Sequence, residues 1–172
     1  SMKLYLAHKF GQYKLDPNNT FDWIMDVNEK AGNIVDFSFL AMKTDSFFDG
    51  CYSLDDHFIR NLLNDINCRG HNISLHPSYH TYLDSKQVTM EINKLQEVLA
   101  EEGISKNVNT SRQHYLRWKT PVTANNLVSA GIEYDSTLSF AETVGFRCGI
   151  CYEYQLYDVV QRSTINLIER PL

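Results

Sequence analysis

A chain of 172 residues is long enough for one domain with a buried core and too short for two comfortable ones. Its formal net charge of −5 argues against a nucleic-acid partner, because phosphate recognition needs a basic surface. No apolar run approaches the roughly 20 residues that cross a bilayer, and the start lacks the pattern of a signal peptide, so a cytoplasmic protein is expected.

The first half of the sequence predicts helices and strands in alternation. A helix, a strand, a helix and a strand are expected over residues 20–31, 33–42, 53–70 and 71–76. The second helix is marked by Ser53 as its N-cap and by Gly70 as its stop signal.

The second half continues the same rhythm. A helix, a short strand, a helix and a strand are expected over residues 84–103, 107–111, 120–131 and 132–138, and a last strand lies within 163–172. Such alternation predicts one α/β domain over residues 1–172, with parallel strands joined by right-handed crossovers in an open sheet or a barrel. In such folds functional groups gather at the carboxyl ends of the strands.

Two histidines follow the strand that ends at residue 76. In "ISLHPSYHTYLD", His76 and His80 are four residues apart, a spacing at which two imidazoles can meet one divalent metal such as zinc. A metal site also needs a further protein ligand, so the alternative is a loop anchor at His76 and a solvent-facing side chain at His80.

A second polar segment, "SRQHYLRW", follows the expected strand 107–111. Cationic and aromatic residues alternate here, which suits a carbohydrate or another polar ligand. Arg112, His114, Tyr115 and Trp118 are the candidate binding residues. The alternative is a cationic loop that only covers the rim of the fold.

Other short patterns have ordinary explanations. Asp22 and Asp26 in "TFDWIMD" are expected on the solvated face of a helix. Cys148 and Cys151 have the C-x-x-C spacing of zinc and thiol redox sites, but reduced, half-buried thiols are the simpler expectation. No G-x-S-x-G, phosphate-binding glycine loop or dinucleotide fingerprint is present.

Four segments in order, "RGHNISLHPSYHTY", "SRQHYLRW", "AGIEYDSTLSFA" and "GFRCGICYEY", resemble the polysaccharide deacetylase-like proteins of the NodB-homology family, in the branch found with surface-polysaccharide genes. The resemblance covers most of the chain, from about residue 16 to residue 172. It implies a distorted or incomplete (β/α) barrel. It also implies an enzyme that hydrolyses N-acetyl groups on amino sugars with a divalent metal, held by one Asp and two His.

The resemblance assigns roles to individual residues. The family's H-x-x-x-H motif matches His76 and His80 as metal ligands, and its arginine-led motif matches Arg112, here followed by "QHYLRW". The family's first motif, which supplies the metal Asp and the general base, has only a helical "TFDW" as its nearest string. Its late Leu-x-His motif has no counterpart. The resemblance therefore implies a chain truncated at the N-terminus, with the base Asp upstream, and allows a truncated C-terminus as well.

The expected function is metal-dependent removal of N-acetyl groups from a surface polysaccharide or its precursor, with a chain that is inactive alone as one alternative. Arg112 and His114 are the supporting catalytic candidates, and the substrate-binding set adds Tyr79, Tyr115 and Trp118. The alternatives are a non-catalytic deacetylase-like domain that binds glycan or a partner protein, and a barrel metallohydrolase acting on a small molecule. The partner expected is a carbohydrate, with no nucleic acid and no membrane-spanning segment.

Overall fold

The structure is a computed structural model that describes residue 13 and residues 16–171. Its helices are α2 (Phe21–Lys30), α3 (His57–Cys68), α4 (Ser85–Glu101) and α5 (Val122–Ser129). Its strands are β1 (Asp36–Phe39), β2 (Asn72–Leu75), β3 (Thr110–Ser111), β4 (Tyr134–Asp135), β5 (Tyr154–Asp158) and β6 (Ser163–Glu169). Two short 3-10 turns, η2 (Thr81–Leu83) and η3 (His114–Leu116), lie among them.

The strands form one sheet in the order β1-β2-β3-β4-β6-β5. The first five in this order are parallel, as the strand–helix alternation predicts, whereas β5 pairs antiparallel to β6. The segment that forms β5 was not expected to be a strand. β1 and β5 are the two ends of the order, so the described residues form an open sheet and not a closed barrel.

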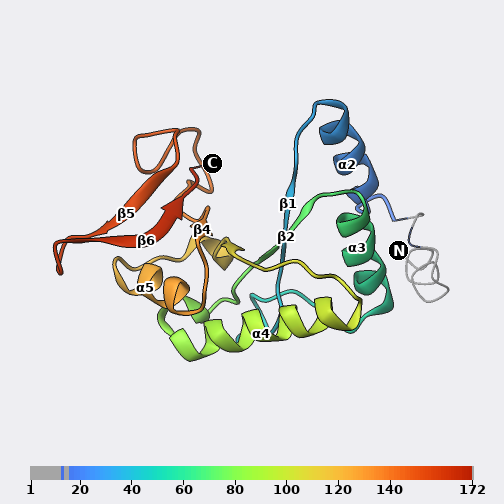
Figure 1. The fold of residues 1–172 in the computed structure, drawn as a ribbon, viewed down its shortest axis with the longest axis horizontal. Helices are drawn as coiled ribbons and strands as arrows, with labels where there is room; N and C mark the ends of the chain where they lie inside the picture. Colours follow the sequence, from blue (N-terminus) through green and yellow to red (C-terminus); the bar gives the residue numbers. More distant parts are fainter. Residues whose placement is uncertain (1–12, 14–15, 172) are drawn as a thin grey trace.

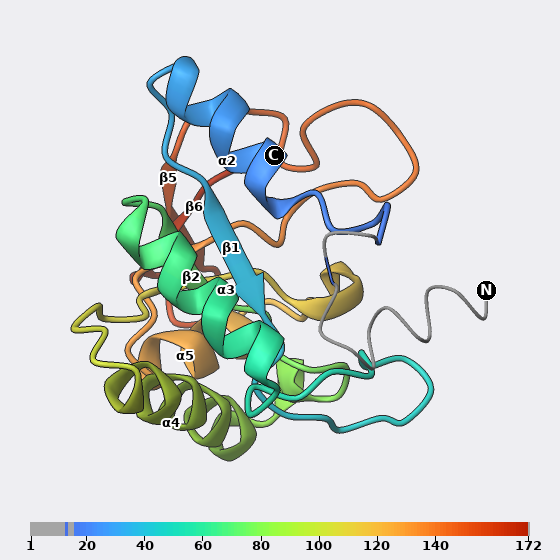
Figure 2. The ribbon, with the colours of Figure 1, turned by 90° about the vertical axis from the view of Figure 1, so that its right-hand side faces the viewer.

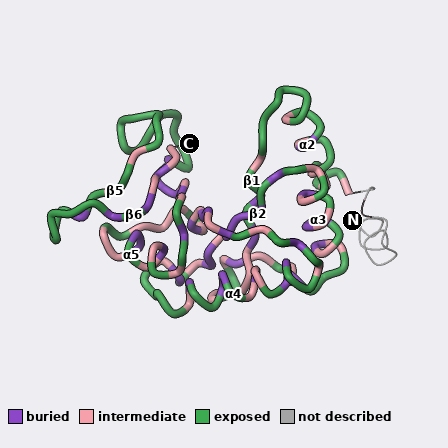
Figure 3. Tube along the Cα trace, viewed as in Figure 1, coloured by how far each residue is buried: buried purple, intermediate pink, exposed green. Residues whose placement is uncertain are grey.

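The helices bury one side of the edge strand β1, whereas the central strands β2 and β3 are buried on both sides. In β1, Phe37 and Phe39 are buried and Asp36 and Ser38 are exposed, which is the alternation of a strand with one packed face. Helices α3 and α4 pack on β2, and α5 packs on β6 (Figure 1). The buried residues therefore lie along the central strands and on the inner sides of the helices (Figure 3).

The start of α3 differs from the expected one. The helix begins at His57, and Asp56 occupies the N-cap position that was predicted for Ser53. Ser53 instead lies one turn earlier, where its backbone N–H donates to Asp56 Oδ2 at 2.8 Å. The stop signal is confirmed, because Gly70 has φ of +79°, a conformation that costs glycine little.

The carboxyl ends of the parallel strands meet along one row. Leu75, Ser111, Asp135 and Glu169 are register partners across β2, β3, β4 and β6. The long connection from β1 to α3, residues 40–56, extends beyond the carboxyl end of β1 (Figure 2). It brings a loop to the same edge of the sheet.

Candidate active site

Polar residues directly follow the row of strand ends. His76, Arg112, Ser136 and Arg170 each come one residue after the row, and their backbone N–H groups extend the ladder between neighbouring strands. The N–H of His76 donates to Phe39 O at 2.8 Å, and that of Arg112 donates to Leu75 O at 3.1 Å. The sheet therefore fixes the backbone beneath both predicted site residues.

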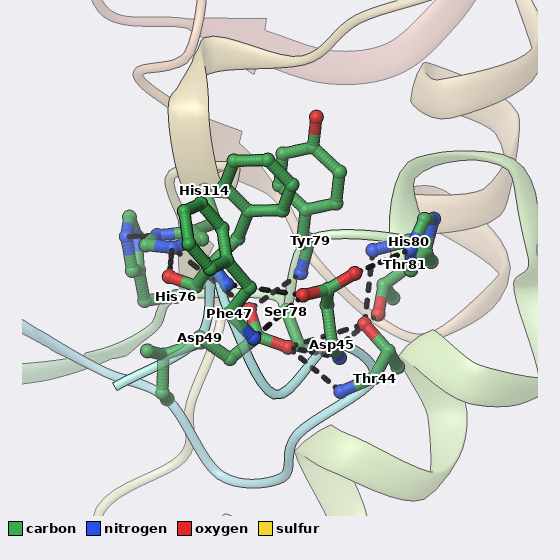
Figure 4. Close-up of polar contacts among 12 residues, drawn as sticks. Thr44, Asp45, Phe47, Asp49, His76, Ser78, Tyr79, His80, Thr81 and His114 are labelled. Carbon is green, nitrogen blue, oxygen red and sulfur yellow. Dashed lines mark hydrogen bonds and ion pairs between the residues drawn. The ribbon is translucent and has the colours of Figure 1, made fainter. Parts of the chain in front are cut away.

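His76 lies against His114, a pairing that their spacing of 38 residues does not reveal. His76 Nε2 is 2.8 Å from His114 Nδ1, and the two rings stand edge to face (Figure 4). The other ring nitrogens bond to the backbone, since His76 Nδ1 donates to Arg112 O at 2.5 Å and His114 Nε2 donates to Phe48 O at 2.8 Å. Burial, followed by the adjacent His114, lowers the pKa of His76 to about 4.

The left-handed turn of η3 presents His114 to His76. Tyr115 and Leu116 have φ values of 56° and 51°, a region that residues other than glycine rarely occupy. Such backbone strain costs on the order of 1 kcal/mol per residue and gathers at functional sites. The turn is held by the His114 N–H, which donates to Pro77 O at 3.2 Å.

Asp49, which the sequence analysis did not single out, joins two loops beneath this pair. Its side chain is fully buried. Oδ2 accepts from the N–H groups of Thr44 and Asp45 at 2.7 and 2.8 Å, and Oδ1 accepts from the N–H of Tyr79 at 2.8 Å. Oδ1 is also 3.8 Å from His114 Nε2. A loop carboxylate in the β1–α3 connection carries no periodic signal, so only the fold reveals its role.

His80 has different neighbours from His76. Its Nε2 is 3.1 Å from Asp45 Oδ2, its backbone N–H donates to Thr44 Oγ1 at 2.9 Å, and its side chain is 55% exposed. The rings of His76 and His80 lie on opposite sides of the loop that carries Asp45 and Asp49 (Figure 4). The two predicted metal ligands are thus near one loop but face different partners.

A cleft of about 530 Å³ opens beside His76. Its walls include three of the predicted site residues, His76, Arg112 and Tyr115, together with Ser38 and Phe140. Among the described residues, no hydrogen bond or ion pair engages the guanidinium of Arg112. An unpaired guanidinium in a cleft can bind a carboxylate or a carbonyl oxygen of a ligand.

An aromatic cluster, defined by Phe47, Phe48, Tyr79 and Tyr115, borders the histidine pair. Phe48 and Tyr79 are stacked with ring centroids 4.1 Å apart, and Tyr115 meets both rings edge on. Phe47 is 85% and Tyr115 61% exposed. Phe48 and Tyr79 are half-buried, so the cluster presents two exposed rings, Phe47 and Tyr115, on a half-buried stacked pair.

The remaining predicted binding residue, Trp118, lies elsewhere. It is half-buried and packs against the hydrophobic core, and its Nε1 donates to Thr120 Oγ1 at 3.0 Å. These contacts give Trp118 a structural role, and no described contact joins its ring to the aromatic cluster.

A pair of buried carboxyls, also missed from the sequence, occupies the end of the same strand row. Asp135 and Glu169 are register partners on β4 and β6, and both are fully buried. Asp135 accepts from Ser111 Oγ and Thr137 N, while Glu169 accepts from Leu138 N through Oε1 only. Burial raises the pKa of Asp135 to about 6, and burial together with the Asp135 charge raises that of Glu169 to about 8.

The acidic pair on α2, the cysteines and the search for metal and membrane elements have plain outcomes in the described residues. The helical assignment of Asp22 and Asp26 is confirmed, since both lie exposed on α2 facing Arg69. All four cysteines are free and exposed, not half-buried. Within the described part of the chain, no three His, Cys, Asp or Glu side chains are grouped to hold a metal ion, and no helix is long and apolar enough to cross a membrane.

Comparisons with known proteins agree with the fold. No protein-family model matches the sequence, and no curated protein matches it at a significant level. Among solved structures, the chain is similar to the crystal structure of a "putative polysaccharide deacetylase" from Mycobacterium smegmatis. The TM-score is 0.53 at 17% identity, over 87% of this chain and 44% of that one. The chain thus spans less than half of that protein and shares with it an α/β fold with a mostly parallel sheet.

Proposed function

We propose that this chain is the deacetylase-like part of a metal-dependent hydrolase that removes N-acetyl groups from amino sugars of a surface polysaccharide or its precursor. The observation that carries the proposal is the cleft at the carboxyl edge of the sheet. There, the imidazole of His76, whose Nε2 faces His114, lines the same cleft as Arg112, whose guanidinium has no partner among the described residues. The fold shared with the mycobacterial protein supports the same reading.

The residues present fit part of a metal site. Because His76 Nδ1 donates to a backbone carbonyl, its Nε2 keeps the lone pair that a metal ligand needs, and such a second hydrogen bond is usual for metal-binding histidines. The resemblance names His80 as the second ligand and an aspartate as the third. Zinc, when bound at such a site, polarises a carbonyl and acidifies a water molecule.

The chain's own residues would bind and orient the sugar. Arg112 is placed to hold an oxygen of the substrate, and His114, which pairs with His76, keeps that ring in one orientation. The exposed ring of Tyr115 would pack on the apolar side of a sugar, and Tyr79, whose faces are covered by Phe48 and Arg117, would offer its ring edge. These residues already contact one another in the absence of ligand, so little conformational entropy of their side chains would be lost when a sugar binds.

Acetate release tests this function. With zinc supplied, the protein, in the longest form that contains this chain, is expected to release acetate from N-acetylated amino-sugar oligomers. His76→Ala should lower the rate at least about 100-fold, because the protein loses a proposed ligand and binds the metal more weakly. His57→Ala, a change of an exposed histidine on α3, is the matched control and should leave the rate unaltered. A metal-loaded protein that releases no acetate from any such oligomer would contradict the proposal.

A second function, a non-catalytic glycan-binding domain, is favoured by one observation. The exposed ring of Tyr115, which belongs to the aromatic cluster, lines the cleft, as a ring of a sugar-binding surface would. Glycan binding without acetate release, measured on the same zinc-supplied protein, would select this function over the hydrolase.

Both functions predict that Tyr115 contributes to glycan binding. Tyr115→Ala is expected to weaken binding of amino-sugar oligomers about two- to tenfold, from the roughly 0.5–1.5 kcal/mol of one aromatic contact. Its 61% exposure means that the free energy of unfolding should change little. Titration calorimetry measures the binding. Tyr157→Ala on β5, with 49% exposure, is the control. Equal affinities for the two variants would exclude the cluster as a glycan surface.

A further inference from the structure

The two facing histidines pose a problem of hydrogen bonding. A carbonyl oxygen carries no hydrogen, so His76 Nδ1 and His114 Nε2 must each carry the proton that they donate to Arg112 O and Phe48 O. In neutral rings, the remaining nitrogens, His76 Nε2 and His114 Nδ1, then both hold lone pairs. These two nitrogens face each other at 2.8 Å.

Two lone pairs at this distance repel, unless a cation lies between them. The cation is either a proton, which makes one ring an imidazolium, or a metal ion. Each neutral ring has a single N–H, and both are used on backbone carbonyls, so neutral rings have no proton to place between the facing nitrogens. The fully buried Asp49 carboxylate, 3.8 Å from His114 Nε2, adds negative charge on the far side of the pair and favours a cation there.

We infer that His76 Nε2 and His114 Nδ1 form a two-nitrogen site for a divalent transition metal such as zinc, with His114 and not His80 as the partner of His76. This inference deepens the proposed function, since it reassigns the second ligand of that metal. Both rings already donate their other N–H to a backbone carbonyl, the arrangement that orients metal-binding histidines.

His80 lacks these features. Its Nε2 contacts Asp45 Oδ2 at 3.1 Å, and its side chain is 55% exposed, so neither burial nor a backbone carbonyl fixes its ring. The histidine pair, by contrast, borders the cleft through His76, which leaves room for water or further ligands. Two nitrogens at 2.0–2.1 Å from one tetrahedral zinc are roughly 3.3 Å apart, so the pair must open slightly on binding.

Metal titration of single variants tests the inference. Zn²⁺ is titrated calorimetrically into metal-free protein, and Co²⁺ is followed by its visible absorption. We expect His114→Ala to weaken both affinities at least about 100-fold, like His76→Ala, and His80→Ala to change them less than about threefold. Circular dichroism verifies the folding of each variant.

A measurement on the unaltered protein guards against a misfolded His114→Ala variant. Nitrogen-15 NMR of the imidazole rings is expected to show His76 protonated at Nδ1 and His114 at Nε2, with the other two nitrogens shifting when Zn²⁺ is added. A proton shared by the two rings that Zn²⁺ fails to displace would overturn the inference.

The outcomes separate this inference from the proposed function. If His80→Ala abolishes metal binding and His114→Ala does not, the ligand assignment is wrong, while the hydrolase proposal stands. If metal binds through His114 and no acetate is released, the metal site stands and the hydrolase proposal fails.

Discussion

Replacing Asp49 with alanine is expected to lower the free energy of unfolding by about 3–5 kcal/mol. The carboxylate is fully buried and accepts hydrogen bonds from the backbone N–H groups of Thr44, Asp45 and Tyr79. Alanine would leave three donors without their acceptor, two in the β1–α3 connection and one in the loop after β2. Chemical denaturation measures the loss.

The same substitution should disturb the site beyond its effect on stability. His114 Nε2 donates to Phe48 O, whose loop is anchored by Asp49, so loosening that loop frees the His114 ring. Hydrogen exchange at the amides of Asp45 and Tyr79 should become much faster than in the unaltered protein. If these amides keep their protection, Asp49 is not the anchor.

Asp45→Asn is the matched control for Asp49. Asp45 accepts from the N–H groups of Phe47 and Phe48 through Oδ1, and an asparagine oxygen can do the same. Its Oδ2 contacts the exposed His80 ring, a surface contact whose loss costs little. We therefore expect a change in the free energy of unfolding of less than about 1 kcal/mol. Asp49→Asn should be far worse than this control, because both buried oxygens accept from backbone N–H groups and an amide NH₂ would face one of these donors.

The second large effect is a loss of stability at alkaline pH from the Asp135–Glu169 pair. Both carboxyls have raised pKa values in the folded protein, about 6 and about 8, against roughly 4 in the unfolded chain. The folded state thus binds more protons than the unfolded state between about pH 4 and pH 8. The stabilisation is complete below pH 4 and is lost as the pH rises through these folded-state values.

Glu169→Gln should remove most of this dependence. Glutamine resembles the protonated acid, can still accept from Leu138 N, and can donate to Asp135. We expect similar melting temperatures for the two proteins at pH 5, and a higher one for the variant at pH 9. The gain there should be about 4–8 °C, from a free energy on the order of 2 kcal/mol.

A control isolates the pair from other groups that titrate at alkaline pH. Glu133→Gln changes an exposed carboxylate on the neighbouring segment, which accepts only from Asn109 Nδ2 at 3.0 Å. Its melting temperature should follow the unaltered protein at every pH. A Glu169→Gln variant that is destabilised at pH 9 would show that the carboxyls ionise without cost.

The helices and parallel strands were predictable because their apolar periods are strong. The stripe of Val88, Ile92, Leu95 and Leu99 marks α4, and all four are buried in the structure. The β5 strand was missed because it lies at the sheet edge, where only Asp158 of its residues is buried and alternation is weak. β5 and β6 are antiparallel because a short hairpin joins them, whereas the parallel strands are joined by crossover connections.

Individual site residues could be predicted from the sequence, but the contact between His76 and His114 could not. His76 and Arg112 were found because each directly follows a parallel strand, and both line the cleft. Sequence spacing favoured His80 as the neighbour of His76, whereas sheet order places β3 beside β2 and thereby brings His114 to it. Asp49 and Glu169 had no signal, since an isolated acid in a loop or strand end resembles a solvated one.

Arg117 makes part of the aromatic cluster rigid. Its guanidinium lies between the rings of Tyr79 and Tyr82, 4.0 and 4.1 Å from their centroids, and donates to Tyr79 O and Tyr82 Oη. The ring of Tyr79 is therefore covered on one face by Arg117 and on the other by Phe48, and it has little rotamer freedom left to lose on binding. The rate of ligand exchange at Tyr79 should therefore be set by dissociation of the ligand and not by movement of the protein. In Arg117→Lys the ammonium group cannot stack on the two rings, so the same surface would become flexible.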